Sequence, residues 1–154
     1  MDFIIQGPSL GKAVDCEVIL RSLPEWFGIE EAVNQLARDI ETLPTFIAVM
    51  DALVVGFLTL KHHSEYATEI LVMGVKRDLH RNGIGRALVE SAETYLRTQN
   101  IEYLQVKTLS SSHPDEDYAR TRQFYTAMGF RPLEELSTLW GEENPCLLMI
   151  KGLT

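Results

Sequence analysis

The sequence is poor in cysteine and has no long apolar run. Only two of the 154 residues are cysteines, Cys16 and Cys146, and they stand far apart. A disulfide framework needs more cysteines and a structural metal site needs closer ones, so we expect two buried free thiols in a reducing compartment and no metal centre. No apolar stretch approaches the ~18–20 residues that a membrane-spanning helix requires, so no membrane partner is expected.

Basic residues are scarce relative to acidic ones. Lys and Arg number 14 against 22 Asp and Glu, which gives a net charge of −8. A protein that binds nucleic acid normally presents a basic face, so this balance argues against a nucleic-acid partner. The amino-terminal residues lack the basic segment followed by an apolar run that marks a signal peptide, so the expected location is cytoplasmic.

The chain also lacks internal repeats, low-complexity tracts and linkers rich in Pro, Gly or Ser. Its length matches that of one domain, which is typically about 100–150 residues. With 45% hydrophobic residues it can bury one sizeable core. We therefore expect residues 1–154 to form a single domain.

Hydrophobic periodicity predicts a mixed α/β fold. Strands are expected over residues 2–6, 45–50, 53–61, 67–75, 103–109, 130–135 and 146–151, and helices over residues 11–23, 29–41, 84–99 and 118–128. In segment 11–23, Val14, Val18 and Ile19 recur at helical spacing and predict a helix. Hairpins give way to strand–helix–strand crossovers, so the strands at 67–75 and 103–109 are expected to be parallel neighbours.

Residues 70–86, ILVMGVKRDLHRNGIGR, carry the clearest functional signal. A strand runs into a glycine-containing loop that opens a helix. The first N–H groups of a helix have no internal partner and the helix dipole is positive there, so this is an anion site. Gly83 and Gly85 allow a ligand close to the backbone, and three arginines add positive charge. A pyrophosphate group is the expected ligand of this loop.

Two common phosphate-binding patterns do not fit this loop. The P-loop string is absent, and the dinucleotide-binding fingerprint would require a third glycine where Leu88 stands. The pattern that remains is an acyl-CoA loop, Gln/Arg-x-x-Gly-x-Gly/Ala, at the start of a helix.

Over nearly its whole length the chain resembles the GNAT superfamily of N-acetyltransferases. The resemblance rests on residues 75–88, VKRDLHRNGIGRAL, and on residues 124–130, FYTAMGF, which look like the family's Tyr-x-x-x-Gly-Phe element. His80 departs from the family's usual Gln or Arg, and Tyr118 stands where many members have Asn. The resemblance implies the GNAT fold: a central mixed sheet, splayed between its fourth and fifth strands and flanked by about four helices.

The resemblance also implies acetyl-CoA as the acyl donor. Its pantetheine arm would pair with the open edge of the fourth strand, where Gly74 would hold a bulge and the Val75 N–H would face the acyl carbonyl. Its pyrophosphate would meet N–H groups at the start of the helix. The implied cofactor-binding residues are Met73, Gly74, Val75, His80, Arg81, Asn82, Gly83, Ile84, Gly85 and Arg86.

Attack of an amine on a thioester needs a base for the amine and an acid for the leaving thiolate. Tyr125 matches the family's usual general acid, and a phenol with a pKa of about 10 is protonated at neutral pH; the alternative is a core aromatic. Glu69 is the one carboxylate in an apolar strand and is the candidate base, acting through water. Alternation would place Glu69, Leu71 and Met73 on one face. The alternative for Glu69 is a solvated carboxylate or a salt bridge.

The predicted function is transfer of the acetyl group of acetyl-CoA to a primary amine of an unidentified small-molecule or peptide acceptor, by direct attack in a ternary complex. The alternative is a non-catalytic acyl-CoA sensor. Trp26, Phe27 and Trp140 lie in expected loops and either wall the acceptor pocket or cap the core. Acidic residues in loops 22–30 and 136–144 favour a cationic amine. A homodimer agrees with the resemblance, because dimers are common in the family.

Overall fold

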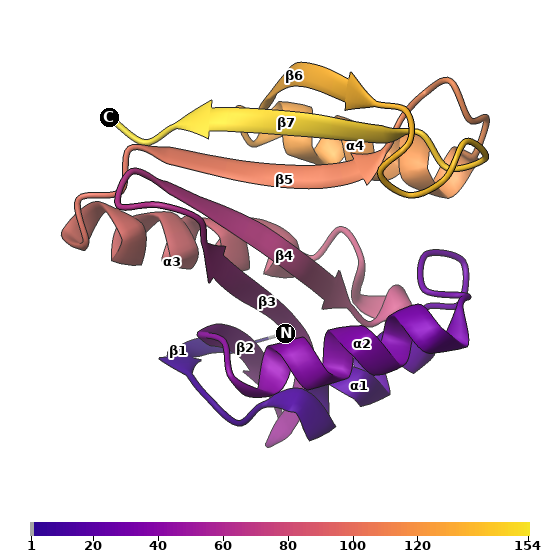
Figure 1. The fold of residues 1–154 in the computed structure, drawn as a ribbon. Helices are drawn as coiled ribbons and strands as arrows, with labels where there is room; N and C mark the ends of the chain where they lie inside the picture. Colours follow the sequence, from indigo (N-terminus) through magenta and orange to yellow (C-terminus); the bar gives the residue numbers. More distant parts are fainter. Residues whose placement is uncertain (1) are drawn as a thin grey trace.

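The computed structural model describes residues 2–154 as one seven-stranded sheet with helices on both faces (Figure 1). The strands are β1 (Ile4–Ser9), β2 (Thr45–Met50), β3 (Leu53–His62), β4 (Ala67–Val75), β5 (Tyr103–Leu109), β6 (Arg131–Leu136) and β7 (Cys146–Gly152). The helices are α1 (Ala13–Arg21), α2 (Glu30–Glu41), α3 (Ile84–Thr98) and α4 (Glu116–Ala127), with a short 3₁₀ helix, η1 (Arg77–Leu79). The predicted α/β class and four main helices are confirmed.

The strands lie in the order β1-β2-β3-β4-β5-β7-β6. Every neighbouring pair is antiparallel except β4 and β5, which are parallel. The predicted parallel pair is therefore confirmed. It follows from the crossover through α3, because a strand that returns after a helix packed on the sheet runs in the same direction as the strand before it.

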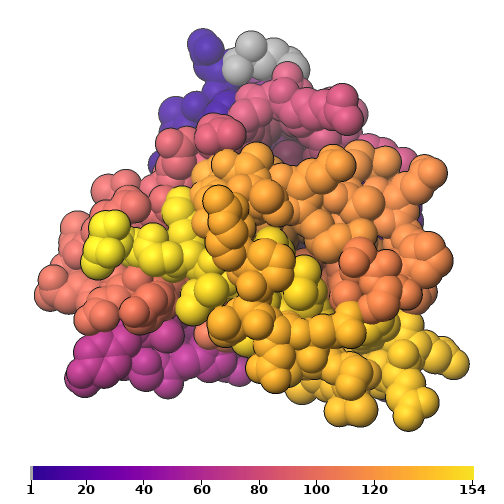
Figure 2. Space-filling model, turned by 90° about the horizontal axis from the view of Figure 1, so that it is seen from above, coloured from indigo at the N-terminus to yellow at the C-terminus, as the bar shows by residue number. Residues whose placement is uncertain are grey.

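The helices form two layers, one on each face of the sheet (Figure 1). On one face, α1 and α2 pack on a cluster that includes Phe57 and Val72. On the other face, α3 and α4 pack on a larger cluster that includes Leu58 and Val106. Seen from above, most of the surface belongs to the carboxyl-terminal part of the chain, coloured orange to yellow (Figure 2).

The buried face of α1 does not include all the apolar residues whose spacing predicted the helix. Val14 and Val18 are 79% and 61% exposed, whereas Cys16, Ile19 and Leu20 are fully buried. Both sets have helical spacing, so local periodicity allows either face to turn inward. Docking against β3 and β4 selects the face with the cysteine, and its thiol is free, as predicted for both cysteines.

Several element boundaries also differ from the prediction, and two of the shifts have a clear physical cause. β1 continues through Pro8 instead of ending there, because an edge strand can lack a ladder N–H on its open side. α4 begins at Glu116, before the predicted residue 118, because the Asp115 carboxylate accepts hydrogen bonds from the N–H groups of Asp117 and Tyr118 at 2.9 and 3.1 Å.

The feature that positions the functional site is the short pairing between β4 and β5. It joins only residues 67–70 of β4 to residues 103–106 of β5, although both strands continue beyond it. Past Ile70 and Val106 the two strands diverge, as Figure 1 shows. The splay implied by the GNAT resemblance is therefore present, and it opens the sheet where the chemistry was predicted.

Candidate active site

The splay leaves the second half of β4 without a strand on its β5 side. The Lys76 N–H donates to the Val55 carbonyl of β3 at 2.9 Å. In an antiparallel pair, hydrogen-bonding groups alternate between the two sides of a strand, so the Gly74 N–H also points toward β3. The N–H groups of Met73 and Val75 therefore point to the open edge. Two backbone donors are available there to an extended ligand.

The bulge of β4 lies at Leu71. Successive residues of β3 pair with Ile70 and Val72, so Leu71 is the extra residue. A bulge interrupts the alternation of faces: Leu71 packs in the α1–α2 cluster and Met73 in the α3–α4 cluster. The prediction that Glu69, Leu71 and Met73 share one face is wrong for this reason.

The prediction of a bulge at Gly74 is also wrong. A Cβ at Gly74 would lie 3.3 Å from side-chain atoms of both Ile19 and Leu23 and 3.4 Å from the Phe57 ring. The glycine therefore serves the close packing of α1 and the following loop against the sheet.

The loop from β4 to α3 has the geometry of an anion cradle. Gly83 is the N-cap residue of α3 and has a φ of +83°, a conformation that suits glycine. Ala87 is the first helical residue whose N–H reaches a carbonyl of this turn, that of Gly83 at 3.0 Å, so the N–H groups of Ile84, Gly85 and Arg86 lack intrahelical partners. Before them, Arg81, Asn82 and Gly83 are exposed.

Gly85 lies where α3 and α4 approach each other. A Cβ at this position would stand 3.3 Å from two carbons of the Phe124 ring and 3.8 Å from the end of Met73. The absence of a side chain keeps the first turn of α3 open toward the edge of β4. The cradle and the open edge thus form one continuous surface.

The His80 ring is already engaged within the protein. Its Nε2 lies 2.7 Å from the Val75 carbonyl oxygen, and its ring packs edge-on to Trp26 with centroids 5.8 Å apart. The side chain therefore fixes the end of β4 relative to the loop. This contact gives a physical role to the histidine at the position where the family usually has Gln or Arg.

Tyr125 lies on α4, facing both the core and the site. It is 6% exposed, packs edge-on to Phe124 and Phe130, and lines the cavity described below. Burial and, to a lesser degree, nearby Tyr118 raise the pKa of the Tyr125 phenol well above its usual value. The residue is thus a core aromatic and at the same time a phenol that lines the cavity. The two interpretations of the sequence are compatible.

Glu69 is buried and paired. It is 4% exposed, and its two carboxylate oxygens each accept a hydrogen bond of 3.1 Å from the Lys107 ammonium. The His63 Nε2 lies 2.6 Å from one of the same oxygens. The predicted salt bridge is therefore present. Glu69 also lines the cavity, so its carboxylate remains next to the space where an acceptor would enter.

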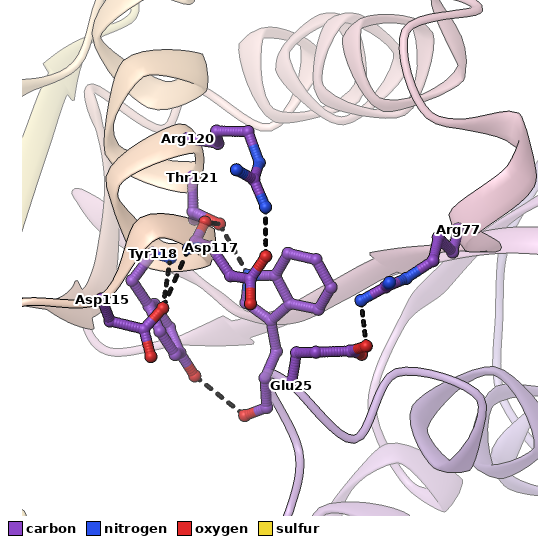
Figure 3. A network of polar contacts seen from close by, with 8 residues as sticks. Glu25, Arg77, Asp115, Asp117, Tyr118, Arg120 and Thr121 are labelled. Atoms are coloured by element: carbon purple, nitrogen blue, oxygen red, sulfur yellow. Dashed lines mark hydrogen bonds and ion pairs between the residues drawn. The ribbon is translucent and has the colours of Figure 1, made fainter.

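The loop between α1 and α2 is tied across the splay to α4 and η1 (Figure 3). The Trp26 indole N–H donates to Thr121 Oγ1 at 3.0 Å, and the Tyr118 hydroxyl donates to the Trp26 carbonyl at 2.8 Å. Glu25 of the same loop forms an ion pair with Arg77. The loop is held from both sides of the site, and no local pattern in the sequence predicts these long-range partners.

A cavity of about 1540 Å³ runs along the splay and joins these parts. It is lined by the open edge of β4, the start of α3, α4 and the loops that carry Trp26, Phe27 and Trp140. The three aromatics therefore wall the cavity, and Trp26 and Phe27 also pack against the α1–α2 cluster.

Two lining residues carry buried polar atoms that sequence reasoning missed. Thr108 Oγ1 and His113 Nδ1 have no hydrogen-bond partner within residues 2–154. Buried polar groups are normally paired, so both atoms are suited to a polar ligand in the cavity.

Within residues 2–154, no three His, Cys, Asp or Glu side chains gather in a way that could hold a metal ion. No helix among these residues is long and apolar enough to cross a membrane.

Comparison with known proteins agrees with this geometry. Residues 42–132 match the family model of the acetyltransferase (GNAT) domain. A search of curated proteins found no match to the sequence. Among solved structures, the ribosomal-protein-S18-alanine N-acetyltransferase from Escherichia coli is 15% identical, with a TM-score of 0.79 over 99% of this chain and 95% of that one.

Two further structures share the fold. Ard1 from Thermoplasma volcanium is 21% identical, with a TM-score of 0.77 over 100% of this chain and 99% of that one. A GNAT family acetyltransferase from Elizabethkingia anophelis with acetyl-CoA bound is 16% identical, with a TM-score of 0.74 over 97% of each chain. The splayed sheet, the glycine-bearing cradle and the family match over most of the chain lead to one conclusion: this protein belongs to the GNAT acetyltransferase family.

Proposed function

We propose that the protein is an acetyl-CoA-dependent N-acetyltransferase that acts as a single domain and transfers the acetyl group to a primary amine in a ternary complex. The observation that carries the proposal is the continuity of the open β4 edge with the α3 cradle. One surface thus offers backbone donors for an extended arm and, next to them, backbone donors for a pyrophosphate.

The residues present fit acetyl-CoA in charge and in shape. The cradle combines the N–H groups of Ile84, Gly85 and Arg86 with the cationic side chains of Arg81 and Arg86, and both arginines line the cavity. The pantetheine arm carries amide groups, which match the Val75 N–H at the strand edge next to the cradle and leave the Met73 N–H for the acyl group. Thr108, whose buried hydroxyl has no partner, lines the same cavity and offers a further polar contact.

Three groups divide the chemistry. Val75 adjoins the cradle and the arm extends away from the pyrophosphate, so the acyl oxygen at the end of the arm reaches the Met73 N–H rather than the expected Val75 N–H. The Met73 N–H donates a hydrogen bond to this oxygen as negative charge develops on it. Glu69, through a chain of water molecules along the cavity, removes a proton from the attacking amine, and its pairing with Lys107 holds the carboxylate in place. The Tyr125 hydroxyl donates its proton to the sulfur as the C–S bond breaks, and its raised pKa keeps that proton available at neutral pH.

The experiment that tests this function is release of free thiol from acetyl-CoA in the presence of a panel of primary amines. We expect amine-dependent thiol release and an acetylated product detected by mass spectrometry. Tight acetyl-CoA binding without turnover on any amine would instead support the acyl-CoA sensor. Tyr125 favours the enzyme, because a sensor needs no proton donor at the thiolate.

A further inference from the structure

The acceptor end of the cavity, at the apex of the splay, is basic. Lys61 of β3 lies opposite Glu69 of β4 in the strand register, so the two side chains are on the same face of the sheet. Residues two apart along an extended chain share a face, so His63 lies on this face too. Lys107 reaches the same carboxylate from β5. All four side chains line the cavity. We call Lys61, His63, Glu69 and Lys107 the apex cluster.

The apex cluster holds more positive charge than negative. Glu69 supplies one negative charge, which Lys107 neutralises at 3.1 Å. Lys61 is exposed to solvent and forms no ion pair with any carboxylate of residues 2–154. Even with a neutral His63, the cluster therefore carries one uncompensated positive charge.

The acidic loop residues do not offset this charge. Glu142 and Glu143 do not line the cavity, and Glu30 forms an ion pair with Arg21 away from it. Glu25 does line the cavity, but Arg77 neutralises it. The acidic loops therefore do not support a cationic amine, because their charges are either outside the cavity or already paired.

The distance along β4 sets the length of the acceptor. Glu69 and Met73 are four residues apart, and a strand rises about 3.3 Å per residue, so the apex cluster lies on the order of 10 Å from the open edge. In a free α-amino acid the amine and the carboxylate are attached to the same carbon, which is too close to reach both places. An extended molecule can reach both.

We infer that the acceptor is an extended amine that carries a carboxylate about 10 Å from its nitrogen, and that Lys61 of the apex cluster binds this carboxylate. The inference rests on the proposed function and names its substrate class. The amine end reaches the open edge of β4, and Lys61 discriminates by charge at the other end.

The test compares three acceptors of equal length: ω-aminooctanoate, octylamine and octamethylenediamine. We expect the wild-type kcat/KM to be about tenfold higher for the amino acid than for either other amine, which is the effect of one favourable charge contact. Lys61→Glu should lower this preference by about tenfold or more, and Lys61→Gln should lower it less. The matched control is Lys12→Glu, which changes net charge equally at a residue that does not line the cavity.

The outcomes distinguish a failure of the anionic-acceptor inference from a failure of the proposed acetyltransferase function. Acetyl transfer that favours the diamine, or a preference that is unchanged in both Lys61 variants, overturns the anionic acceptor and leaves the acetyltransferase intact. The same holds if amines of the wider panel are acetylated but none of the three. If no amine at all is acetylated while acetyl-CoA binds, the proposed function fails and the inference fails with it. Melting temperatures of the variants show whether a lost preference reflects misfolding.

Discussion

Tyr125 is both a packed core residue and a residue that lines the cavity. Its ring is packed between Phe124 and Phe130 in the core, yet the residue borders the cavity. Burial raises the pKa of the phenol because the charged form would lose its hydration. The hydroxyl is therefore protonated over the whole neutral and mildly alkaline range, as a proton donor must be.

We expect Tyr125→Phe to lower kcat by an amount near the lower end of the ~10²–10⁴-fold range of general acid catalysis, because a thiolate is a fair leaving group unaided. The ring packing is kept, so acetyl-CoA affinity and melting temperature should stay nearly constant. Steady-state kinetics and calorimetry check this. Tyr103→Phe, at an exposed position of β5, is the control. Full kcat in Tyr125→Phe would refute the acid role.

Glu69→Gln should affect both rate and stability. We expect kcat to fall by ~10²–10⁴-fold at pH values below the pKa of the amine, with most of the loss recovered at higher pH where the amine is already neutral. The Lys107 ammonium loses a charged partner, which costs about 1.5–3 kcal/mol of unfolding free energy. The pH–rate profile and urea denaturation measure the two effects.

A second variant separates the two roles of Glu69. Adding Lys107→Gln removes the stranded ammonium, so the double variant should recover part of the lost stability but none of the lost rate. If the double variant also recovers the rate, Glu69 acts only through its ion pair and is not the base.

At the scale of elements, the site depends on how closely α3 approaches α4. Gly85 makes this approach possible, since its missing Cβ would already crowd the Phe124 ring. The same glycine lies in the first turn of α3, where the unpaired N–H groups are. Packing and ligand access therefore depend on one residue.

We expect Gly85→Val to weaken acetyl-CoA binding by tenfold or more, because overpacking of about 1–3 kcal/mol displaces the first turn of α3 from the β4 edge. Isothermal titration calorimetry gives the dissociation constant. Gly152→Val is the matched control, since a Cβ there meets no atom within 4 Å. If the Gly85→Val variant bound acetyl-CoA as tightly as the wild type, the cradle would not be the acetyl-CoA binding site.

The loop between α1 and α2 shows how elements distant in sequence assemble one site. Its contacts to Thr121, Tyr118 and Arg77 join the amino-terminal helices to α4 and to η1. Figure 3 shows these contacts, with the α4 side chains on one side of the loop and Arg77 on the other. The wall of the cavity is thus fixed by the tertiary structure.

At the scale of the whole molecule, several buried acids hold their protons more tightly than in an unfolded chain. Burial is the main cause: it raises the pKa of Cys16 to about 12, that of Cys146 to about 11 and that of Tyr118 to about 12. Unfolded thiols ionise near pH 8.5–9. Above about pH 9 the unfolded chain has therefore released protons that the folded chain still binds, and this difference favours unfolding.

We expect the unfolding free energy to be constant with respect to these groups below about pH 8 and to fall as the pH rises from about 9 toward 11–12. Urea denaturation followed by circular dichroism at a series of pH values measures the slope. Cys16→Ala should be less stable at neutral pH, because it leaves a cavity, but should show a shallower alkaline slope. A flat profile in the wild type would contradict the burial of these groups.

The sequence by itself determined the parts of the protein that depend on local pattern. Periodicity identified the strands and main helices, and the crossover between β4 and β5 predicted their parallel pairing. The string around Gly83 predicted the cradle, because a left-handed residue before a helix start suits glycine and the helix N-terminus needs no distant partner. The family motif around Tyr125 is also local, since its helix ends at Ala127 and the positive φ of Gly129 stops it there.

Only the tertiary structure decided which faces and charges meet. The buried side of α1, the bulge at Leu71 and the pairing of Glu69 with Lys107 all depend on strand register and on residues far away in the chain. The acidic loops show the same limit: their charge is visible in the sequence, but Glu25 is neutralised and Glu142 lies outside the cavity. Local pattern fixes what an element is. Long-range packing fixes the direction in which it faces, and the charge inside a site follows from that direction.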